Sequence, residues 1–431
     1  MTKKTVSALL FLAAVLVAAL PSGSARAAES LSLEKAVSIA LEKNLDVLSA
    51  REELTRAEGN LVYARSGLFP SISLNGTASR RNEESSKYEE ENVANVSLSQ
   101  YLYAGGVISA GYEQARQTRV KAAQDVRNAE EAVALRVVEA YLSVLQKKAD
   151  EETARDALSY YDNAARELGK RFELGLARKL DYSRAVQQRE NAAADFTAAR
   201  NALASARIDL LTLLRMPPGA EVEVAGDLEA GETALNRDGS LARALADRPD
   251  LQSLKTAAKV QRSAVEIARG GMKPIVTLSA SYQLEYDSTP ASSAEDDDWV
   301  ATVTMKVPVF DGGLTRGKVM QAKATLNQAE QAASKREETV AAEVNQSVLS
   351  VESTFETVGA ARKSLDLAAE NLRLAEVGYR EGVNTQLDVL SARTTLTEAR
   401  QKLSSALKSY RVALAGLWKA EGALVEKVLK R

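Results

Sequence analysis

The chain has 431 residues, with 56 basic and 58 acidic side chains and neither cysteine nor histidine. Without an excess of positive charge, nucleic acid is excluded as an expected partner. Without Cys and His the chain lacks disulfides, a lipidated N-terminal cysteine and the commonest nucleophilic, acid–base and metal-ligating groups, so we expect no enzyme, no metal site and no cofactor.

The N-terminal segment has the three-part build of a secretory signal. Lys3 and Lys4 precede an apolar run that ends at Pro21, and small residues follow up to Ala28. The run is shorter than the ~18 residues of a spanning helix. We therefore expect residues 1–28 to be a signal peptide, and a mature chain that starts near Ala28 or Glu29 with 53 basic and 58 acidic side chains.

Landmarks in the first half of the chain recur in the second half. The segment 40–46 matches 244–250, and Pro70 with its alternating successors matches Pro274, both at an offset of 204 residues. Gly105-Gly106 and Gly175 match Gly312-Gly313 and Gly382 at an offset of 207. Because these matching positions occur in the same order in both halves, they predict two copies of one supersecondary unit, residues 29–232 and 233–431.

Each copy contains two segments with an alternating pattern. They lie within about 68–104 in the first copy and within about 273–310 in the second. Alternation of apolar and polar residues predicts β-strands of ~10 residues with one apolar face. The apolar positions are Leu68, Ile72, Leu74 and Ala78; Ala94, Val96, Leu98 and Leu102; Val276, Leu278, Ala280, Tyr282 and Leu284; and Trp299, Ala301, Val303, Met305 and Val307. Polar linkers, Asn82–Asn92 and Asp287–Asp298, have the character of exposed hairpin tips.

Long helices follow each β-hairpin, over about 105–214 and about 312–418. Neither run from the paired glycines to Phe172 or Tyr379 contains proline. Apolar residues recur every seven positions, which predicts coiled-coil packing. These seams are Val351, Val358, Leu365, Leu372 and Tyr379; Val389, Leu396, Leu403, Tyr410 and Leu417; and Ala185, Ala192, Ala199, Ala206 and Leu213.

Four strands cannot close a barrel in lipid, because open edges would leave backbone groups without hydrogen bonds and the smallest spanning barrels have about eight strands. The strands therefore predict an oligomer. Two protomers would supply eight strands and three would supply twelve, and the strand pattern by itself does not choose between them.

In the order of these features, the sequence resembles the TolC-like outer membrane efflux protein family. The resemblance rests on the signal, the two repeats, Phe69-Pro70 and Lys273-Pro274 before strands, and Phe310-Asp311-Gly312-Gly313 after the last strand. It implies an α+β membrane protein: a homotrimer with a twelve-stranded transmembrane β-barrel and a long antiparallel α-helical coiled-coil barrel in the periplasm. It also implies a mixed layer between them, formed by the helix at Leu33–Lys43, the connector 216–239 and the segment after Trp418.

The same resemblance implies that the chain is an outer-membrane exit duct of a tripartite efflux or type I secretion system. Its implied partners are outer-membrane lipid, a periplasmic adaptor protein and an inner-membrane transporter of RND, ABC or MFS type. The adaptor would dock at the two helix–helix turns, formed by Leu174, Gly175 and Leu176 and by Glu381, Gly382 and Val383.

A periplasmic gate is implied at the same end. Tyr379 and Asp181 match positions whose side chains bond between neighbouring coiled coils, and Asp388 matches a lumen-facing anionic ring. Ser391 and Asn384 depart from the family pattern, which calls for a second ring aspartate and a basic gate residue there. An equally open interpretation is that the aspartates only favour the helix N-terminus through its dipole and that Tyr379 fills a heptad position.

A different function class remains as an alternative, namely a soluble periplasmic adaptor or a secreted coiled-coil protein. Such a protein could share the signal and the helical hairpins, but it would have no use for four strands suited to lipid. The transported substrate and the pump type are not specified by the sequence.

Overall fold

The computed structural model describes residues 29–82, 88–220, 222–231, 233–287 and 298–430 of the chain. The predicted signal peptide, residues 1–28, lies outside the described residues. So do the central parts of the two polar linkers, 83–87 and 288–297.

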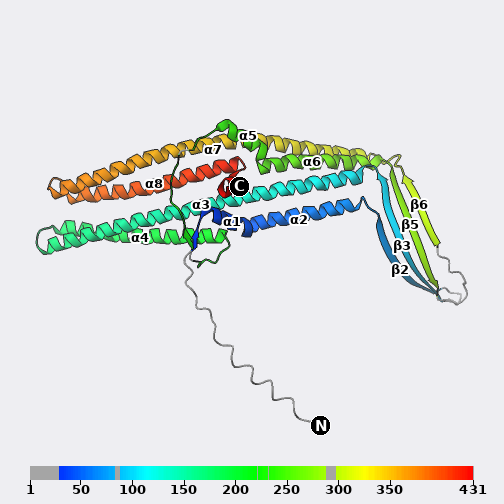
Figure 1. Cartoon of the computed structure of the whole chain (residues 1–431), viewed down its shortest axis with the longest axis horizontal. Helices are drawn as coiled ribbons and strands as arrows, with labels where there is room; N and C mark the ends of the chain where they lie inside the picture. The colour runs from blue at the N-terminus through cyan, green and yellow to red at the C-terminus, as the bar shows by residue number, and fades with distance from the viewer. Residues whose placement is uncertain (1–28, 83–87, 221, 232, 288–297, 431) are drawn as a thin grey trace, which may run out of the picture.

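The molecule is elongated, with a β-sheet at one end and two helix–helix turns at the other (Figure 1). Short helices and the C-terminus lie between these ends. The first copy comprises α1 (Leu33–Lys43), α2 (Leu45–Ser66), β2 (Ser71–Asn82), β3 (Tyr88–Ala104), α3 (Val107–Glu173) and α4 (Lys179–Leu213). The second comprises α5 (Arg237–Asp247), α6 (Pro249–Arg269), η1 (Gly270–Met272), β5 (Ile275–Asp287), β6 (Asp298–Lys306), α7 (Leu314–Arg380) and α8 (Gln386–Ala420), followed by α9 (Leu424–Leu429).

The helices of the two copies correspond in length and spacing. Both α3 and α7 have 67 residues and both α4 and α8 have 35, and each pair begins 207 residues apart. Helices α1 and α5 have 11 residues each and begin 204 apart. At ~1.5 Å per residue α3 and α7 are each about 100 Å long, so one copy reaches from the sheet to the far turns.

Paired glycines start both long helices with left-handed backbone. Their φ angles are +63° and +83° at Gly105 and Gly106, and +66° and +87° at Gly312 and Gly313. A Cβ atom at Gly105 would lie 2.8 Å from the carbonyl oxygen of Gly270. Glycine is therefore needed at Gly105 both for its φ angle and for the close approach of the two copies.

The sheet joins the two copies in the strand order β2-β3-β5-β6, with every neighbour antiparallel. Cross-strand partners point to one face. Ile72 pairs with Leu98 and Leu98 with Ala280, whereas Ser73 pairs with Ser97 and Ser97 with Ser281. The register thus gathers the predicted apolar positions on one face and the serines on the other, confirming the period-two assignment.

Three details of the strand prediction are wrong, and one of them is that β6 ends at Lys306, before the predicted Val307. The first strand begins at Ser71, because Leu68 and Phe69 are held in a turn by backbone bonds from their N–H groups to the carbonyls of Arg65 and Ser66. The register also shifts between Tyr101 and Tyr103, so Leu102 sits in a bulge. Before this shift, Gln100 pairs with Leu278 on the apolar face. A bulge moves the side chains beyond it by one position, which alternation cannot reveal.

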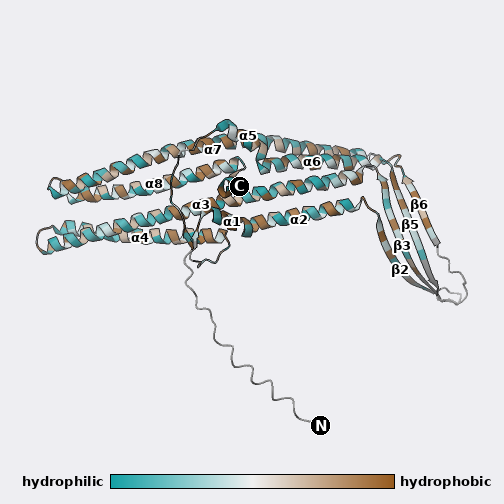
Figure 2. Ribbon diagram, in the orientation of Figure 1, coloured by the Kyte–Doolittle hydropathy of each residue, from teal (hydrophilic) through white to brown (hydrophobic). Residues whose placement is uncertain are grey.

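Most residues of the predicted coiled-coil seams are buried, whereas Ala199, Leu213, Leu365, Tyr379 and Leu403 are half-buried. Val351, Val358, Leu372 and Ala185 have relative exposures of 7% or less, and Tyr410 is 1% exposed. Hydrophobic and hydrophilic residues alternate along all the long helices (Figure 2). Among the described residues, no helix is both long enough and apolar enough to cross a membrane.

A small parallel sheet, β1 (Glu29–Leu31) with β4 (Val222–Val224), lies with the short helices in the mixed layer between the two ends of the molecule. The buried Tyr141 hydroxyl donates to the carbonyl of either Leu31 or Ala225, at 2.9 and 2.5 Å. The pairing of these two strands was not predicted, whereas the helix at Leu33–Lys43 was predicted with the limits it has.

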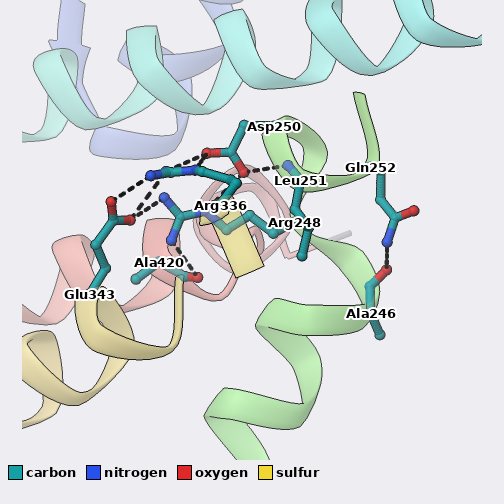
Figure 3. Close-up of polar contacts among 8 residues, drawn as sticks. All are labelled: Ala246, Arg248, Asp250, Leu251, Gln252, Arg336, Glu343 and Ala420. Carbon is teal, nitrogen blue, oxygen red and sulfur yellow. Dashed lines mark hydrogen bonds and ion pairs between the residues drawn. The ribbon is translucent and has the colours of Figure 1, made fainter. Parts of the chain in front are cut away.

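A network of four charged side chains fixes α6 to α7 in this layer (Figure 3). Arg248, 8% exposed, pairs with Asp250 at 3.0 Å and with Glu343. Arg336 pairs with both carboxylates, at 2.6 Å to Asp250 and 2.8 Å to Glu343. Burial tends to raise the pKa of Asp250, but hydrogen bonds from Arg336 and Arg248 outweigh it and lower that pKa.

Candidate functional site at the tips of the helical hairpins

The turn between α3 and α4, the first tip, is closed by a glycine-dependent helix cap. Gly175 has φ +72°, its N–H donates to the carbonyl of Phe172 at 2.9 Å, and the Leu176 N–H donates to that of Arg171 at 2.7 Å. These two bonds define a Schellman motif, which satisfies the last carbonyls of a helix. The predicted docking residues thus form one compact reversal.

The turn between α7 and α8, the second tip, has the same backbone. Gly382 has φ +78°, its N–H donates to Tyr379 at 3.2 Å, and the Val383 N–H donates to Gly378 at 2.8 Å. The duplication therefore extends to individual hydrogen bonds at the tips.

The side chains that support the two tips differ. At the second tip Thr385 and Asp388 form a capping box: Asp388 accepts from the Thr385 N–H at 2.8 Å, and the Asp388 N–H donates to the Thr385 hydroxyl at 3.3 Å. At the first tip Arg178 holds the N-cap position of α4 and makes no side-chain cap. There, Phe172 stacks on Tyr182, with ring centroids 5.6 Å apart and planes inclined by 7°.

Apolar side chains project from both tips. Leu174 is 74% and Leu176 is 75% exposed, and Val383 is 79% exposed. Burying such side chains against a partner is favourable by about 1.5–3 kcal/mol each. Their exposure at the ends of both hairpins is suited to contact with another protein.

The predicted gate residues lie within two turns of the tips, and no hydrogen bond joins them to one another among the described residues. Asp181 is half-buried in the first turn of α4, and Tyr379 packs against the cluster that includes Leu372 and Val389. In the part of the chain that the structure describes, no hydrogen bond joins Tyr379 to Asp181. Asp388 is exposed, and hydrogen bonds from the Thr385 hydroxyl and N–H lower its pKa.

Contacts between the two hairpins were not predicted. Arg393 lies over the ring of Tyr160, and the hydroxyls of Tyr161 and Thr394 are 3.2 Å apart. Farther from the tips, Arg400 pairs with Asp156 at 3.0 Å. The run Tyr160-Tyr161 inside a charged helix is a signal in the sequence for this contact region, here called the α3–α8 contact.

Comparison with known proteins decides the family. The profile of the family described as "Outer membrane efflux protein" matches residues 36–214 and again residues 241–423, one match in each copy. The chain belongs to this family. Family membership confirms the predicted relationship and the predicted location in the outer membrane, and it gives no support to a soluble adaptor or a secreted coiled coil.

Individual relatives match this chain over nearly its whole length. The chain is 26% identical over 401 residues to "Outer membrane protein TolC" of Vibrio cholerae, covering 90% of each chain. It is 24% identical to "Outer membrane efflux protein BepC" of Brucella suis, covering 92% of this chain and 86% of the relative.

Solved structures show the same fold. The Campylobacter jejuni CmeC outer membrane channel superimposes with a TM-score of 0.82 at 18% identity, covering 92% of this chain and 88% of that one. The open-state Neisseria gonorrhoeae MtrE outer membrane channel gives a TM-score of 0.80 at 21% identity, covering 91% and 89%.

Proposed function

We propose that this efflux family member is one protomer of an exit duct that passes substrates from the periplasm and an inner-membrane pump to the outside. It performs no catalysis, and the inner-membrane pump selects the cargo. The observation that carries the proposal is a sheet with one exposed apolar face, set at the end of two helices, α3 and α7, that are each about 100 Å long. Ile72 is 69% and Trp299 is 71% exposed on that face.

The sheet is the basis for proposing a trimer. Strands β2 and β6 are its two edges and pair on one side only. In lipid these edges need partners, and pairing β6 of one protomer with β2 of the next closes a barrel. Three protomers give twelve strands, the count that the family resemblance implies, with the apolar face toward lipid and the serine face toward the lumen.

The duplication supports a matching helical interface. Positions 207 residues apart are equivalent, so the α3–α8 contact within a protomer predicts packing of α7 on α4 of the next protomer. Leu367, equivalent to Tyr160, is 66% exposed in the single chain. In this arrangement the Leu367 side chain would be covered by α4 of the next protomer, in the region around Val186. Val186 is the position equivalent to Arg393.

We further propose that residues 29–232 and 233–431 are the two structural repeats, and that the gate lies at the tips. In this scheme Tyr379 and Asp181 bond across neighbouring hairpins when the duct is closed, and Asp388 contributes to an anionic ring. With Ser391 in place of a second ring aspartate, the ring carries less negative charge. With Asn384 in place of a basic gate residue, a different contact holds the gate closed. The Asn384 side chain donates to the carbonyl of Ala375 at 3.5 Å, which supports a local role for it.

Reconstitution in planar bilayers tests this function. The purified protein should migrate as a heat-modifiable trimer and conduct ions with cation preference. Asp388→Ala should weaken that preference, and the control Thr385→Val, which removes the cap and keeps the charge, should retain it. Tyr379→Phe should raise the open probability. A soluble monomer without conductance would exclude the duct, and unchanged selectivity in Asp388→Ala would exclude the ring.

A further inference from the structure

Several cations at the first tip have no ion-pair partner among the described residues. Lys170, Arg178 and Lys179 are all exposed, and none forms an ion pair among the residues that the structure describes. By contrast, Arg171 beside them pairs with Glu167 at 2.6 Å. The first tip therefore presents three positive charges without partners around two exposed leucines.

Two of these cations oppose the stability of α4. Arg178 is the N-cap and Lys179 the first residue of this helix. A helix dipole disfavours positive charge at its N-terminus, and Arg is not among the residues that cap well. In the second copy the equivalent positions are Thr385, which caps α8, and Gln386. The residues at the start of α8 thus favour folding, whereas those at the start of α4 do not.

The charge difference covers the whole tip. Residues 167–184 contain five basic and three acidic side chains, a net charge of +2. The equivalent residues 374–391 contain one basic and three acidic side chains, a net charge of −2. Although Glu376 and Glu381 stand on the second tip, no ion pair joins the two tips among the described residues.

We propose that the first tip docks a protein partner whose contacting end carries carboxylates beside aliphatic side chains. Arg178 and Lys179 receive the carboxylates, and Leu174 and Leu176 bury the aliphatic groups. Charged residues at the rim of such a contact chiefly set its specificity and association rate. This inference rests on the proposed duct function, because it names the chemistry of the partner that meets the tip. The second tip, with opposite charge, is expected to reject the same partner end.

The test uses the full-length protein in detergent and two synthetic helical hairpins as probes, identical except for a Glu-Leu-Glu or a Lys-Leu-Lys turn. The acidic probe should bind about tenfold more tightly at low salt, since two exposed ion pairs contribute that much. The preference should shrink at high salt. Equal binding of the two probes would overturn the inference.

The decisive variant transplants the second tip's residues, Arg178→Thr with Lys179→Gln. Because these residues improve the cap, the variant should fold, yet it should lose the preference for the acidic probe. Arg200→Glu with Arg207→Glu lowers the charge of α4 far from the tip and should keep the preference. A transplanted variant that still prefers the acidic probe would contradict the proposal.

Conductance without any probe separates the remaining outcomes. If the transplanted variant conducts more than the parent at rest, the cations bind the neighbouring protomer's second tip, and the docking proposal is wrong. If the parent protein does not conduct at all, the duct function fails, whereas the probe preference is still measured independently.

Discussion

The guanidinium of Arg393 in α8 lies 4.7 Å from the centre of the Tyr160 ring in α3. This cation–π contact joins the two helical hairpins of one protomer. Burial, with repulsion from Glu376, raises the pKa of Tyr160 to about 12, so the ring stays neutral over the physiological range. The same contact cannot form at the equivalent positions, which are Val186 and Leu367.

Arg393→Ala should therefore loosen the hairpins within a protomer. A partly desolvated cation–π contact contributes about 1 kcal/mol, so amide hydrogen exchange in residues 390–400 should rise about fivefold. Mass-spectrometric exchange measures this directly. Arg373→Ala, which removes an ion pair with Glu370 on the same helix, is the control. Equal protection in the parent and Arg393→Ala would show that the contact has no such role.

The four-residue charge network should matter more than any surface ion pair. Arg336→Met leaves Asp250 and Glu343 with one arginine, and we expect a loss of about 2–3 kcal/mol because the carboxylates are only partly exposed. Arg56→Met breaks a fully exposed pair with Glu53 and should cost under ~0.5 kcal/mol. Thermal unfolding followed by circular dichroism compares them, and similar losses would contradict the prediction.

The same network predicts a loss of stability in acid. Because the pKa of Asp250 is lowered in the folded protein, its contribution is present above its ordinary value of 3.8 and is lost as the pH falls through the lowered pKa. Asp250→Asn should unfold more readily than the parent at neutral pH, and the difference should shrink below pH 3.8. A difference that persists unchanged in acid would exclude this explanation.

Glu131 should have the opposite dependence on pH. This buried α3 carboxylate accepts hydrogen bonds from the N–H groups of Leu424 and Val425, at 3.1 and 3.3 Å, at the start of α9. Burial outweighs those bonds and raises its pKa. The folded protein then binds a proton at a higher pH than the unfolded chain does, so stability should rise as the pH falls through the raised pKa toward the ordinary value of 4.5.

Glu131→Gln should flatten that pH dependence, because an amide does not titrate in this range. Thermal unfolding between pH 5 and 7.5 measures the slope. Glu139→Gln, an exposed position on the same helix, should keep the parent's slope. If the Glu131→Gln slope equals the parent's, another group is responsible.

Replacing the glycine at the first tip should affect stability in the opposite direction to replacing a glycine inside a helix. Gly175 has φ +72° with open space around its Cβ position, so Gly175→Ala should destabilise the protein by about 1 kcal/mol through backbone strain alone. Gly359, inside α7 and also unobstructed, should gain up to ~1 kcal/mol on substitution by Ala. Unfolding measurements that give both changes the same sign would refute this account.

Periodicity made much of the fold predictable. Heptads continue without a break from Val351 to Tyr379, and glycine marks the reversal at Gly382, so the limits of α7 follow from local sequence. Alternation likewise assigned Ile72 and Ser73 to opposite faces of the sheet. These properties depend on neighbours a few residues away, which is the range over which a sequence pattern carries information.

Contacts between distant elements were decided by the tertiary structure. Glu29 pairs with Val222, and Arg393 meets Tyr160, across separations of some two hundred residues. Such pairs depend on how far one helix is shifted along another, and coiled-coil periodicity leaves that shift open by whole heptads. Local sequence patterns were enough to predict two equivalent hairpins with glycine turns. Only the packed structure showed that α8 has a side-chain cap at its tip, whereas the tip before α4 carries unpaired cations, because capping and ion pairing depend on the distances between side chains.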